Sequence, residues 1–349
     1  MTDAPGSPPG LDLDRLAGFL ELECPGLTAG PLRAEVFDGG KSNITYRVTD
    51  GQGQWVVRRP PLGHVLATAH DMMREHRVIS ALAPTPVPVP RTLALCSDPE
   101  VIGAPFYVME LMSGIPYRQR EQLEPLGPVR VRGIATRMVE VLADLHAVSP
   151  GEVGLGDFGR PEGFLARQVQ RWKKQLDASR SRELPGVDEL FGILVSSVPP
   201  DRAPAIVHGD YRLDNLLIDE ADAVTAVLDW EMATIGDALT DLALMLAYHR
   251  MARLEAGAVI ASASNAEGFL TEDEILETYA RKRGNDLEHV GFYLGLAYYK
   301  LAGILEGIYF RHLGGQTVGA GFDRLGSLTE PLIQAGIASC DASSKGSAR

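Results

Sequence analysis

Cysteine is scarce in this sequence, and so are the patterns that would make it a structural or metal-binding element. Three cysteines occur among 349 residues, Cys24, Cys96 and Cys340, and no two of them form a C-x-x-C pair. Thiols spaced so far apart support neither a disulfide framework nor a cysteine-rich zinc site. This usage fits a reducing compartment, so we expect the protein to be cytoplasmic.

Positive charge is also in short supply. The chain has 33 Lys and Arg residues against 46 Asp and Glu residues, and its formal net charge is −13. Binding to DNA phosphates or to anionic lipid requires clustered basic residues. The first ten residues contain neither the basic nor the apolar segment of a signal peptide. We therefore expect neither nucleic acid nor a membrane as a partner.

Uninterrupted apolar runs of membrane-spanning length are missing as well. The most apolar stretch, residues 291–310, is long enough to cross a bilayer, but Lys300 and Glu306 lie within it. Charged side chains at the centre of a bilayer are costly and rare. The stretch is therefore predicted to be a core helix of a large helical lobe.

The composition is that of a folded protein, with 45% hydrophobic and 23% charged residues. At roughly 100–200 residues per domain, the length predicts about two domains. We expect a disordered lead-in at residues 1–10, a small N-terminal lobe at 11–112, a larger C-terminal lobe at 113–340 and a disordered tail at 341–349.

The hydrophobic pattern differs between the two expected lobes. Alternating residues and Gly-containing turns predict a three-strand antiparallel meander over residues 34–37, 43–48 and 54–58, followed by a helix at 66–82 and a strand at 105–111. Later segments have helical periodicity, interrupted by short β-type runs at 205–208 and 224–228. The expected helices are 129–148, 163–179, 187–198, 237–253, 271–283 and 289–313. The fold class is α+β, with a small sheet in one lobe and helices in the other.

The strongest chemical signal follows the first of these short runs. His208, Gly209 and Asp210 end an apolar strand, Asn215 comes five residues after Asp210, and Asp229 follows a second apolar strand. Phosphoryl transfer from a nucleotide requires one carboxylate that orients and deprotonates a hydroxyl group. It also requires oxygen ligands that hold Mg²⁺ on the phosphates. This spacing supplies both.

The pattern H-G-D-x-x-x-x-N, followed by V-L-D-W-E, resembles the aminoglycoside phosphotransferase family, the small-molecule branch of the protein-kinase-like fold. The resemblance implies a two-lobed kinase-like fold, with ATP and Mg²⁺ as cofactors. It also implies that Asp210 is the catalytic base and that Asn215 and Asp229 are the metal ligands. His208 becomes a scaffold residue of the catalytic loop. Arg212 supports a neighbouring site residue, faces the substrate, or is a solvated loop charge.

The same resemblance implies roles for residues in the helix after this loop and in the N-terminal lobe. Asp241 would accept hydrogen bonds from the backbone of the catalytic loop, as structural support. Arg58 stands where most kinases have Lys, and Glu75 would be its ion-pair partner. The remaining nucleotide-binding candidates are the turn residues Gly39, Gly40, Ser42 and Asn43, which would lie over the phosphates, and Met109, Glu110 and Leu111, whose backbone would pair with adenine.

Further segments are similar to the family branch that is fused to, or encoded beside, acyl-CoA dehydrogenases. They are residues 58–63, 74–77, 208–215, 229–237 and 301–311. This similarity implies a hydroxyacyl-CoA as the leading small-molecule hydroxyl acceptor, and an acyl-CoA dehydrogenase as a partner. The two expected lobes account for nearly all of the 349 residues, so we do not expect a dehydrogenase domain within this chain.

Two alternatives stay open. The first alternative is an aminoglycoside acceptor. Residues 113–349 carry a net charge of −9 out of the total of −13, and an acidic acceptor-binding lobe suits a cationic aminoglycoside. The replacement of Lys by Arg58 is the one feature that favours a catalytically weak nucleotide-binding partner. A metal hydrolase is disfavoured because no two histidines have ligand spacing.

Overall fold

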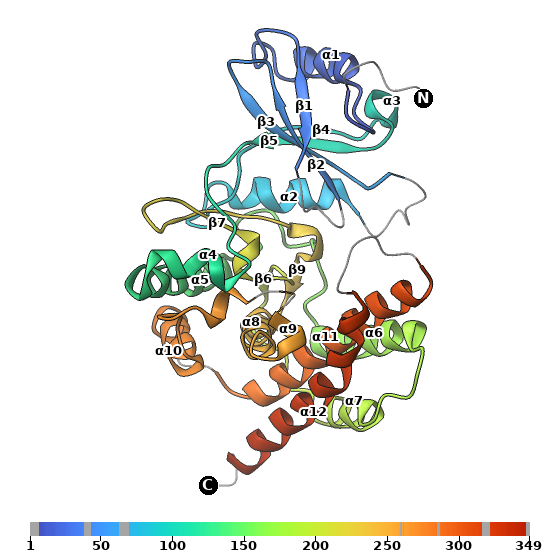
Figure 1. Ribbon diagram of the computed structural model, residues 1–349, viewed down its shortest axis with the longest axis vertical. Helices are drawn as coiled ribbons and strands as arrows, with labels where there is room; N and C mark the ends of the chain where they lie inside the picture. The colour runs from blue at the N-terminus through green and yellow to red at the C-terminus, as the bar shows by residue number, and fades with distance from the viewer. Residues whose placement is uncertain are drawn as a thin grey trace. The chain divides into compact units, whose positions relative to one another are not determined.

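The computed structural model describes residues 7–37, 43–62, 70–258, 260, 262–284, 287–315 and 322–346. The chain divides into two compact units, drawn in Figure 1. Unit 1 comprises Met1–Ser113 and Thr225–Ala233, and unit 2 comprises Gly114–Val224 and Thr234–Arg349. The sequence analysis places the division after residue 112 and does not assign residues 225–233 to the first unit. Within the described ranges, no helix combines the length and the hydropathy that a membrane crossing requires.

Unit 1 is built on a five-stranded antiparallel sheet with the strand order β1-β2-β3-β5-β4. The strands are β1 (Arg33–Val36), β2 (Ile44–Thr49), β3 (Gln54–Arg59), β4 (Thr92–Cys96) and β5 (Phe106–Glu110). The first three form the predicted meander, which is therefore confirmed. β4 is not predicted by the sequence analysis, and it forms the edge of the sheet beside β5.

The turn between β2 and β3 shows how local sequence sets the register of the sheet. The Asp50 carboxylate accepts hydrogen bonds from the backbone N–H groups of Gln52 at 2.9 Å and Gly53 at 2.7 Å. Gly51 has φ of +91°, a conformation that favours glycine. With the turn fixed, alternate residues of β2 face the core, where Tyr46 and Val48 are fully buried.

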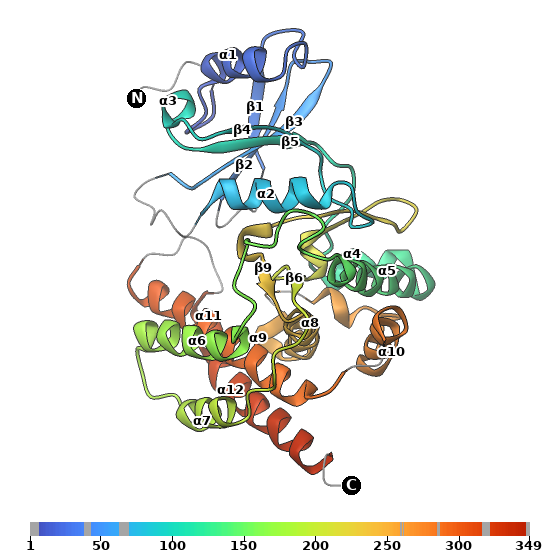
Figure 2. The same ribbon diagram turned by 180° about the vertical axis from the view of Figure 1, so that it is seen from behind.

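Three helices accompany this sheet: α1 (Leu13–Glu23), α2 (Met72–Leu82) and α3 (Pro99–Ile102). Each begins after an aspartate, Asp12, Asp71 or Asp98, whose side chain accepts a hydrogen bond from the first turn. α2 packs against β4 and β5, and α1 lies beside α3, as Figure 2 shows from behind. The predicted start of this helix at Leu66 is too early, because His70 and Asp71 precede the first helical residue, Met72; residues 63–69 lie outside the described part of the chain.

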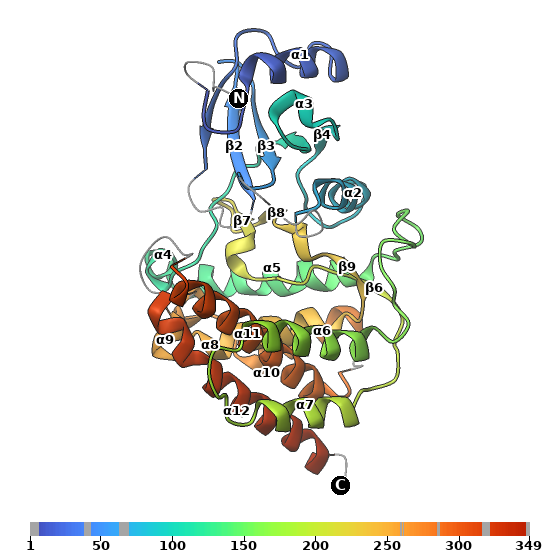
Figure 3. The same ribbon diagram turned by 90° about the vertical axis from the view of Figure 1, so that its right-hand side faces the viewer.

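Unit 2 is mainly helical. Its longer helices are α5 (Pro128–Ala147), α6 (Phe164–Ser179), α7 (Val187–Ser196), α8 (Leu239–Met251), α10 (Glu272–Arg283), α11 (Val290–Leu313) and α12 (Phe322–Gly346). The first six confirm the predicted helices to within a few residues at each end. α11 packs against α6, α8 and α12, and Figure 3 shows α12 running alongside it. α12 is not predicted, and it continues through residues 341–346, which the sequence analysis assigns to a disordered tail.

Short elements complete the described fold. They are the single-turn helices α4 (Arg120–Leu123) and α9 (Glu255–Ala258), the 3₁₀ turns η1 (Glu124–Leu126), η2 (Leu213–Asn215), η3 (Trp230–Met232) and η4 (Ala263–Asn265), and the strands β6 (Ala205–Val207), β7 (Leu216–Ile218), β8 (Val224–Val227) and β9 (Thr234–Gly236). β6 pairs with β9 in an antiparallel ladder. This ladder lies immediately before the loop that carries His208.

Glu306 shows why the apolar run of α11 contains a carboxylate. Its side chain is fully buried and accepts hydrogen bonds from Ser181 at 3.1 Å, Arg182 at 3.0 Å and Thr329 at 3.2 Å. These partners lie between α6 and α7 and on α12. A buried carboxylate is tolerated when it is paired and hydrogen-bonded, so Glu306 joins three segments of unit 2.

We therefore expect Glu306→Ala to destabilise the protein by about 1–3 kcal/mol, because the buried Thr329 hydroxyl loses its acceptor and the partly exposed Arg182 loses its ion-pair partner. Urea unfolding followed by circular dichroism measures the loss. Glu277→Ala, at an exposed position of α10, is the matched control and should change stability by less than about 0.5 kcal/mol. Equal stabilities of the two variants would contradict the structural role of Glu306.

Candidate functional site

The catalytic loop predicted from the sequence begins at the end of β6 and runs through η2. Gly209 has φ of +85°, a left-handed conformation that bends the chain between His208 and Asp210. His208 is fully buried, and its Nδ1 accepts a hydrogen bond from the backbone N–H of Asp210 at 3.2 Å. His208 therefore stabilises the loop from within.

Asp241, in the first turn of α8, holds the same loop from the other side. Its carboxylate accepts hydrogen bonds from the backbone N–H of His208 at 2.6 Å and of Gly209 at 2.8 Å, and His146 Nε2 lies 3.3 Å away. Burial acts to raise the pKa of Asp241. The hydrogen bond and charge of His146, the charge of His208 and the backbone hydrogen bond from Gly209 together outweigh burial and lower the pKa. The buried carboxylate is thereby kept in its ionised form.

The Asp210 side chain is fixed by two neighbours. Tyr248 of α8 donates its hydroxyl to Asp210 Oδ1 at 2.8 Å, and the Asn215 amide nitrogen donates to the Asp210 carbonyl at 2.9 Å and to Oδ2 at 3.2 Å. Burial raises the pKa of Tyr248, so the phenol stays protonated as the donor. The sequence analysis does not identify Tyr248. It lies seven residues after Asp241, on the same helix face, and that spacing is the signal that could have found it.

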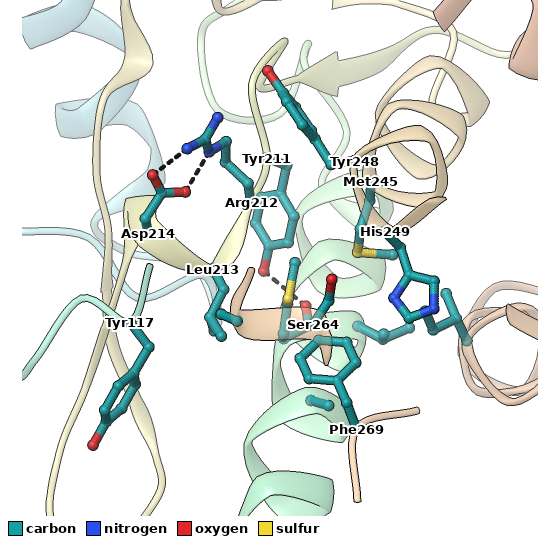
Figure 4. A pocket seen from close by; sticks show the side chains of 15 residues that line it. Tyr117, Tyr211, Arg212, Leu213, Asp214, Met245, Tyr248, His249, Ser264 and Phe269 are labelled. Carbon is teal, nitrogen blue, oxygen red and sulfur yellow. Dashed lines mark hydrogen bonds and ion pairs between the residues drawn. The ribbon is translucent and has the colours of Figure 1, made fainter. Parts of the chain in front are cut away.

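Arg212 is neither solvated nor free. Its guanidinium forms a two-pronged ion pair with Asp214 and lies over the Tyr248 ring, 4.8 Å from the ring centroid (Figure 4). Burial acts to lower the pKa of Arg212, but the hydrogen bond to Asp214 and the charges of Tyr248, Asp214 and Asp210 together outweigh it, and the pKa is raised. Of the three alternatives for Arg212, the solvated loop charge is therefore wrong.

A cavity of about 50 Å³ lies beside this loop within unit 2. Tyr211, Arg212, Leu213 and Asp214 contribute one wall, and side chains from α5, α8, η4 and α10 close the others (Figure 4). The apolar part of the lining is Met138, Val139, Met245, Phe269 and Ile275. The cavity is thus mostly apolar, with its charged groups concentrated on the catalytic loop.

His249 supplies a neutral polar group to this cavity. Burial, and then the charge of Arg253, lower the pKa of His249 to about 4. Arg253 lies 2.9 Å from Nε2, and since guanidinium only donates, the ring proton belongs on Nδ1. Nδ1 is buried and has no hydrogen-bond partner within the described ranges. The cavity therefore offers a buried N–H donor.

The predicted nucleotide-binding pair lies in unit 1. Arg58 of β3 donates from Nε to Glu75 of α2 at 2.7 Å, and from Nη2 to Asp229 at 2.5 Å. Burial acts to lower the pKa of Arg58, but the charges of Glu75 and Asp229 outweigh it and raise the pKa. The fork of Arg58 thus spans two carboxylates, which a single ammonium would do less well.

Asp229 has an unusual backbone for an aspartate. Its φ is +65°, in the left-handed region, and its side chain is 32% exposed. Such strain in a non-glycine residue is typical of functional sites. Together with Arg58 and Met109, it lines a cavity of about 100 Å³ within unit 1.

Of the four turn residues predicted to lie over the phosphates, only Asn43 belongs to the described residues. Asn43 is 1% exposed, and its amide nitrogen donates to Glu75 at 2.7 Å while its oxygen faces His70 Nδ1 at 2.8 Å. The Asn43 side chain is thus used inside unit 1, and a contact with phosphate stays a prediction for its backbone N–H alone. Gly39, Gly40 and Ser42 lie outside the described residues.

The adenine candidates lie at the end of β5. Met109 is 7% exposed, and the backbone N–H of Glu110 donates to the carbonyl of Arg91 at 2.9 Å. This N–H is therefore used within the sheet. Leu111 follows β5 directly, so of the three candidates Met109 faces the cavity and Leu111 begins the exit from the strand.

Each of the two predicted metal ligands offers an oxygen donor of the kind that a divalent cation takes. The Asn215 amide nitrogen is used by Asp210, which leaves its oxygen as the coordinating atom, and no hydrogen bond among the described residues takes that oxygen. Asp229 brings a partly exposed carboxylate. Oxygen donors in this number suit Mg²⁺, which binds through one or two protein oxygens and completes its shell with waters and phosphates. The two donors belong to different units.

Comparison with known proteins gives consistent results. The model of the "Phosphotransferase enzyme family" matches residues 33–283. Acyl-CoA dehydrogenase family member 10 of Mus musculus is 36% identical over 314 residues, which cover 88% of this chain and 29% of that protein. Acyl-CoA dehydrogenase family member 11 of Homo sapiens is 34% identical over 326 residues, which cover 92% of this chain and 41% of that protein. The chain spans less than half the length of these curated relatives.

Solved structures give the same family and fold. A Ralstonia eutropha JMP134 protein that is provisionally named an aminoglycoside phosphotransferase has a TM-score of 0.83 and 32% identity, covering 94% of this chain and 98% of that one. Aminoglycoside phosphotransferase APH(4)-Ia, solved with AMP-PNP and hygromycin B, has a TM-score of 0.61 at 16% identity, covering 93% and 98%. This second likeness is one of fold alone.

The family match spans most of the chain, and the catalytic-loop motif and the kinase-like fold lie within it. The chain belongs to the phosphotransferase enzyme family that includes the aminoglycoside phosphotransferases.

Proposed function

We propose that the protein transfers the γ-phosphoryl group of ATP to an alcohol group of a small molecule, with Asp210 as the base. The observation that supports this most directly is the fixation of the Asp210 carboxylate by Tyr248 and Asn215. A general base must be held within hydrogen-bond reach of the proton it removes, and these two bonds determine its orientation. The backbone bonds from Asp241 secure the loop beneath it.

The residues divide the reaction between them. Asp210 accepts the proton of the acceptor hydroxyl as its oxygen forms a bond to the γ-phosphorus, and the bond between that phosphorus and the ADP oxygen breaks. Arg58 supplies a fixed positive charge for the nucleotide phosphates, held in place by Glu75. Asn215 and Asp229 would hold Mg²⁺, which when bound would supply positive charge to the phosphate oxygens.

For the acceptor, we propose a hydroxyacyl-CoA. The relatives named acyl-CoA dehydrogenases support an acyl thioester. The small cavity beside the catalytic loop has a mostly apolar lining, which suits an apolar group next to the loop. The one carboxylate among the described residues that line this cavity, Asp214, is already paired with Arg212 and Arg118. A cationic aminoglycoside would find no unpaired carboxylate there, although the net charge of unit 2 favours one. An acyl-CoA dehydrogenase is the proposed partner, as the source or consumer of the thioester.

The proposal is tested by coupled ADP release with Mg-ATP and Mg-GTP. The acceptors are 4-hydroxyacyl-CoA and 3-hydroxyacyl-CoA, with aminoglycosides and choline as the competing class. Turnover confined to the thioesters supports the proposed acceptor, and turnover with an aminoglycoside overturns it. Nucleotide binding without turnover on any acceptor favours the catalytically weak nucleotide-binding partner.

Asp210→Asn should lower kcat by roughly 10²- to 10⁴-fold, the usual contribution of a general base. The affinity for nucleotide, measured by calorimetry, should stay within about twofold, because the Arg58 site lies in unit 1. Asp188→Asn, at an exposed position of α7, is the control and should keep full activity. Retained turnover in Asp210→Asn would contradict the assignment of the base.

Arg58→Lys should retain activity, with KM for Mg-ATP raised by roughly tenfold. A single ammonium replaces a fork that reaches both Glu75 and Asp229, so one of the two contacts is lost. Arg58→Met should lose nearly all activity. Arg47→Lys, whose guanidinium pairs with Glu35 on the exposed side of β2, serves as the control. If Arg58→Lys were fully active, the fork would have no part in nucleotide binding.

A further inference from the structure

Lys300 lies near the middle of α11 and reaches the catalytic loop. Its Nζ donates a hydrogen bond to the backbone carbonyl of Gly209, the residue before Asp210. The ammonium also lies over the ring of Trp172 on α6, 5.4 Å from the ring centroid. In the sequence Lys300 interrupts an apolar run, and none of the roles proposed for Asp210, Arg58 and the metal ligands involves it.

The Gly209 residue is consequently held at both ends. Asp241 accepts from its N–H at 2.8 Å, and Lys300 donates to its C=O. The carbonyl of Gly209 and the N–H of Asp210 belong to one planar peptide group, so fixing the first fixes the second. That N–H donates to His208 Nδ1 at 3.2 Å. Lys300 therefore fixes the orientation of the peptide that carries the catalytic base.

Packing alone does not account for a lysine at this position. No ion pair joins Lys300 to a carboxylate within the described ranges. Its charge is compensated by a carbonyl, an aromatic ring and, at longer range, the charges of Asp210 and Asp241. Burial lowers the pKa of the Lys300 ammonium, because the charged form loses hydration. A methionine of similar length would fill the same space without that cost. What the methionine would lose is the hydrogen bond to Gly209.

We propose that Lys300 is a positioning residue for phosphoryl transfer, which keeps the Asp210 carboxylate in its reactive place by holding the Gly209 carbonyl. The proposal rests on the proposed function for its effect on turnover. The predicted effect of Lys300 on the mobility of the loop rests only on the contacts of Gly209 in the structure. The two effects are therefore measured separately.

The first measurement is hydrogen exchange of the backbone amides of residues 208–210, followed by mass spectrometry in the absence of substrate. In Lys300→Met these amides should exchange roughly tenfold faster than in the wild type, because the peptide is released on one side. Lys300→Arg keeps a donor and should exchange at an intermediate rate. Lys282→Met removes an exposed lysine that pairs with Asp144 at 2.6 Å, and should leave the exchange of this loop unchanged.

The second measurement is steady-state turnover of the same variants with the best acceptor. Lys300→Met should lower kcat by roughly 10²-fold, the cost of displacing a catalytic group by about 1 Å, with KM for Mg-ATP unchanged. Lys300→Arg should recover part of the loss, and Lys282→Met should match the wild type. A structural role alone would lower the melting temperature and leave the kcat of the folded fraction unaltered.

Each result decides a separate question. Unchanged exchange in Lys300→Met overturns the proposal, whatever the turnover. Faster exchange with an unchanged kcat also overturns it, because the loop would then tolerate the release. If the wild type turns over no acceptor, the proposed function fails, and exchange alone decides whether Lys300 holds the loop. If Lys300→Met does not fold, the exchange rate and the kcat of Lys300→Arg decide in its place.

Discussion

The organisation of the catalytic loop depends on one buried carboxylate. Asp241 is 1% exposed and accepts the backbone N–H groups of both His208 and Gly209. A buried carboxylate is costly unless its oxygens are satisfied, and here they are satisfied by the loop itself. The loop and the first turn of α8 are therefore stable only together. By holding the backbone at His208 and Gly209, Asp241 also helps to fix the position from which the Asp210 side chain projects.

Unit 1 uses the same device with a different carboxylate. Glu75 is 1% exposed and accepts hydrogen bonds from Arg58 at 2.7 Å, Asn43 at 2.7 Å and Tyr107 at 3.0 Å. With Glu75 fixed by three donors, Arg58 can direct its second prong to Asp229. This arrangement gives a physical reason for arginine at this position. One planar fork serves both carboxylates, whereas the ammonium of lysine is a single point charge.

Local patterns predicted most of the fold and part of the site. The β2–β3 hairpin follows from alternation and the Asp50 turn, and the spacing from Asp210 to Asn215 lies within one loop. Asn43 was placed differently because its partners Glu75 and His70 come from another segment of the chain, beyond the reach of a turn motif. α12 was missed because Pro331 and two glycines interrupt its helical pattern, whereas packing against α11 stabilises it. The seven-residue spacing from Asp241 places Tyr248 on the same helix face, but its contact with Asp210 is tertiary and is seen only in the structure.

The two charges within the apolar run of α11 show how one helix serves two purposes. Lys300 and Glu306 are six residues apart, and at about 100° per residue they project about 120° apart around the helix axis. They therefore meet different neighbours: Lys300 reaches Gly209, and Glu306 reaches Ser181, Arg182 and Thr329. A membrane helix would need to shield both charges from lipid. In this protein each charge has a polar partner supplied by another segment of unit 2. The remaining apolar residues of α11 are thus free to form the core that holds both partners in place.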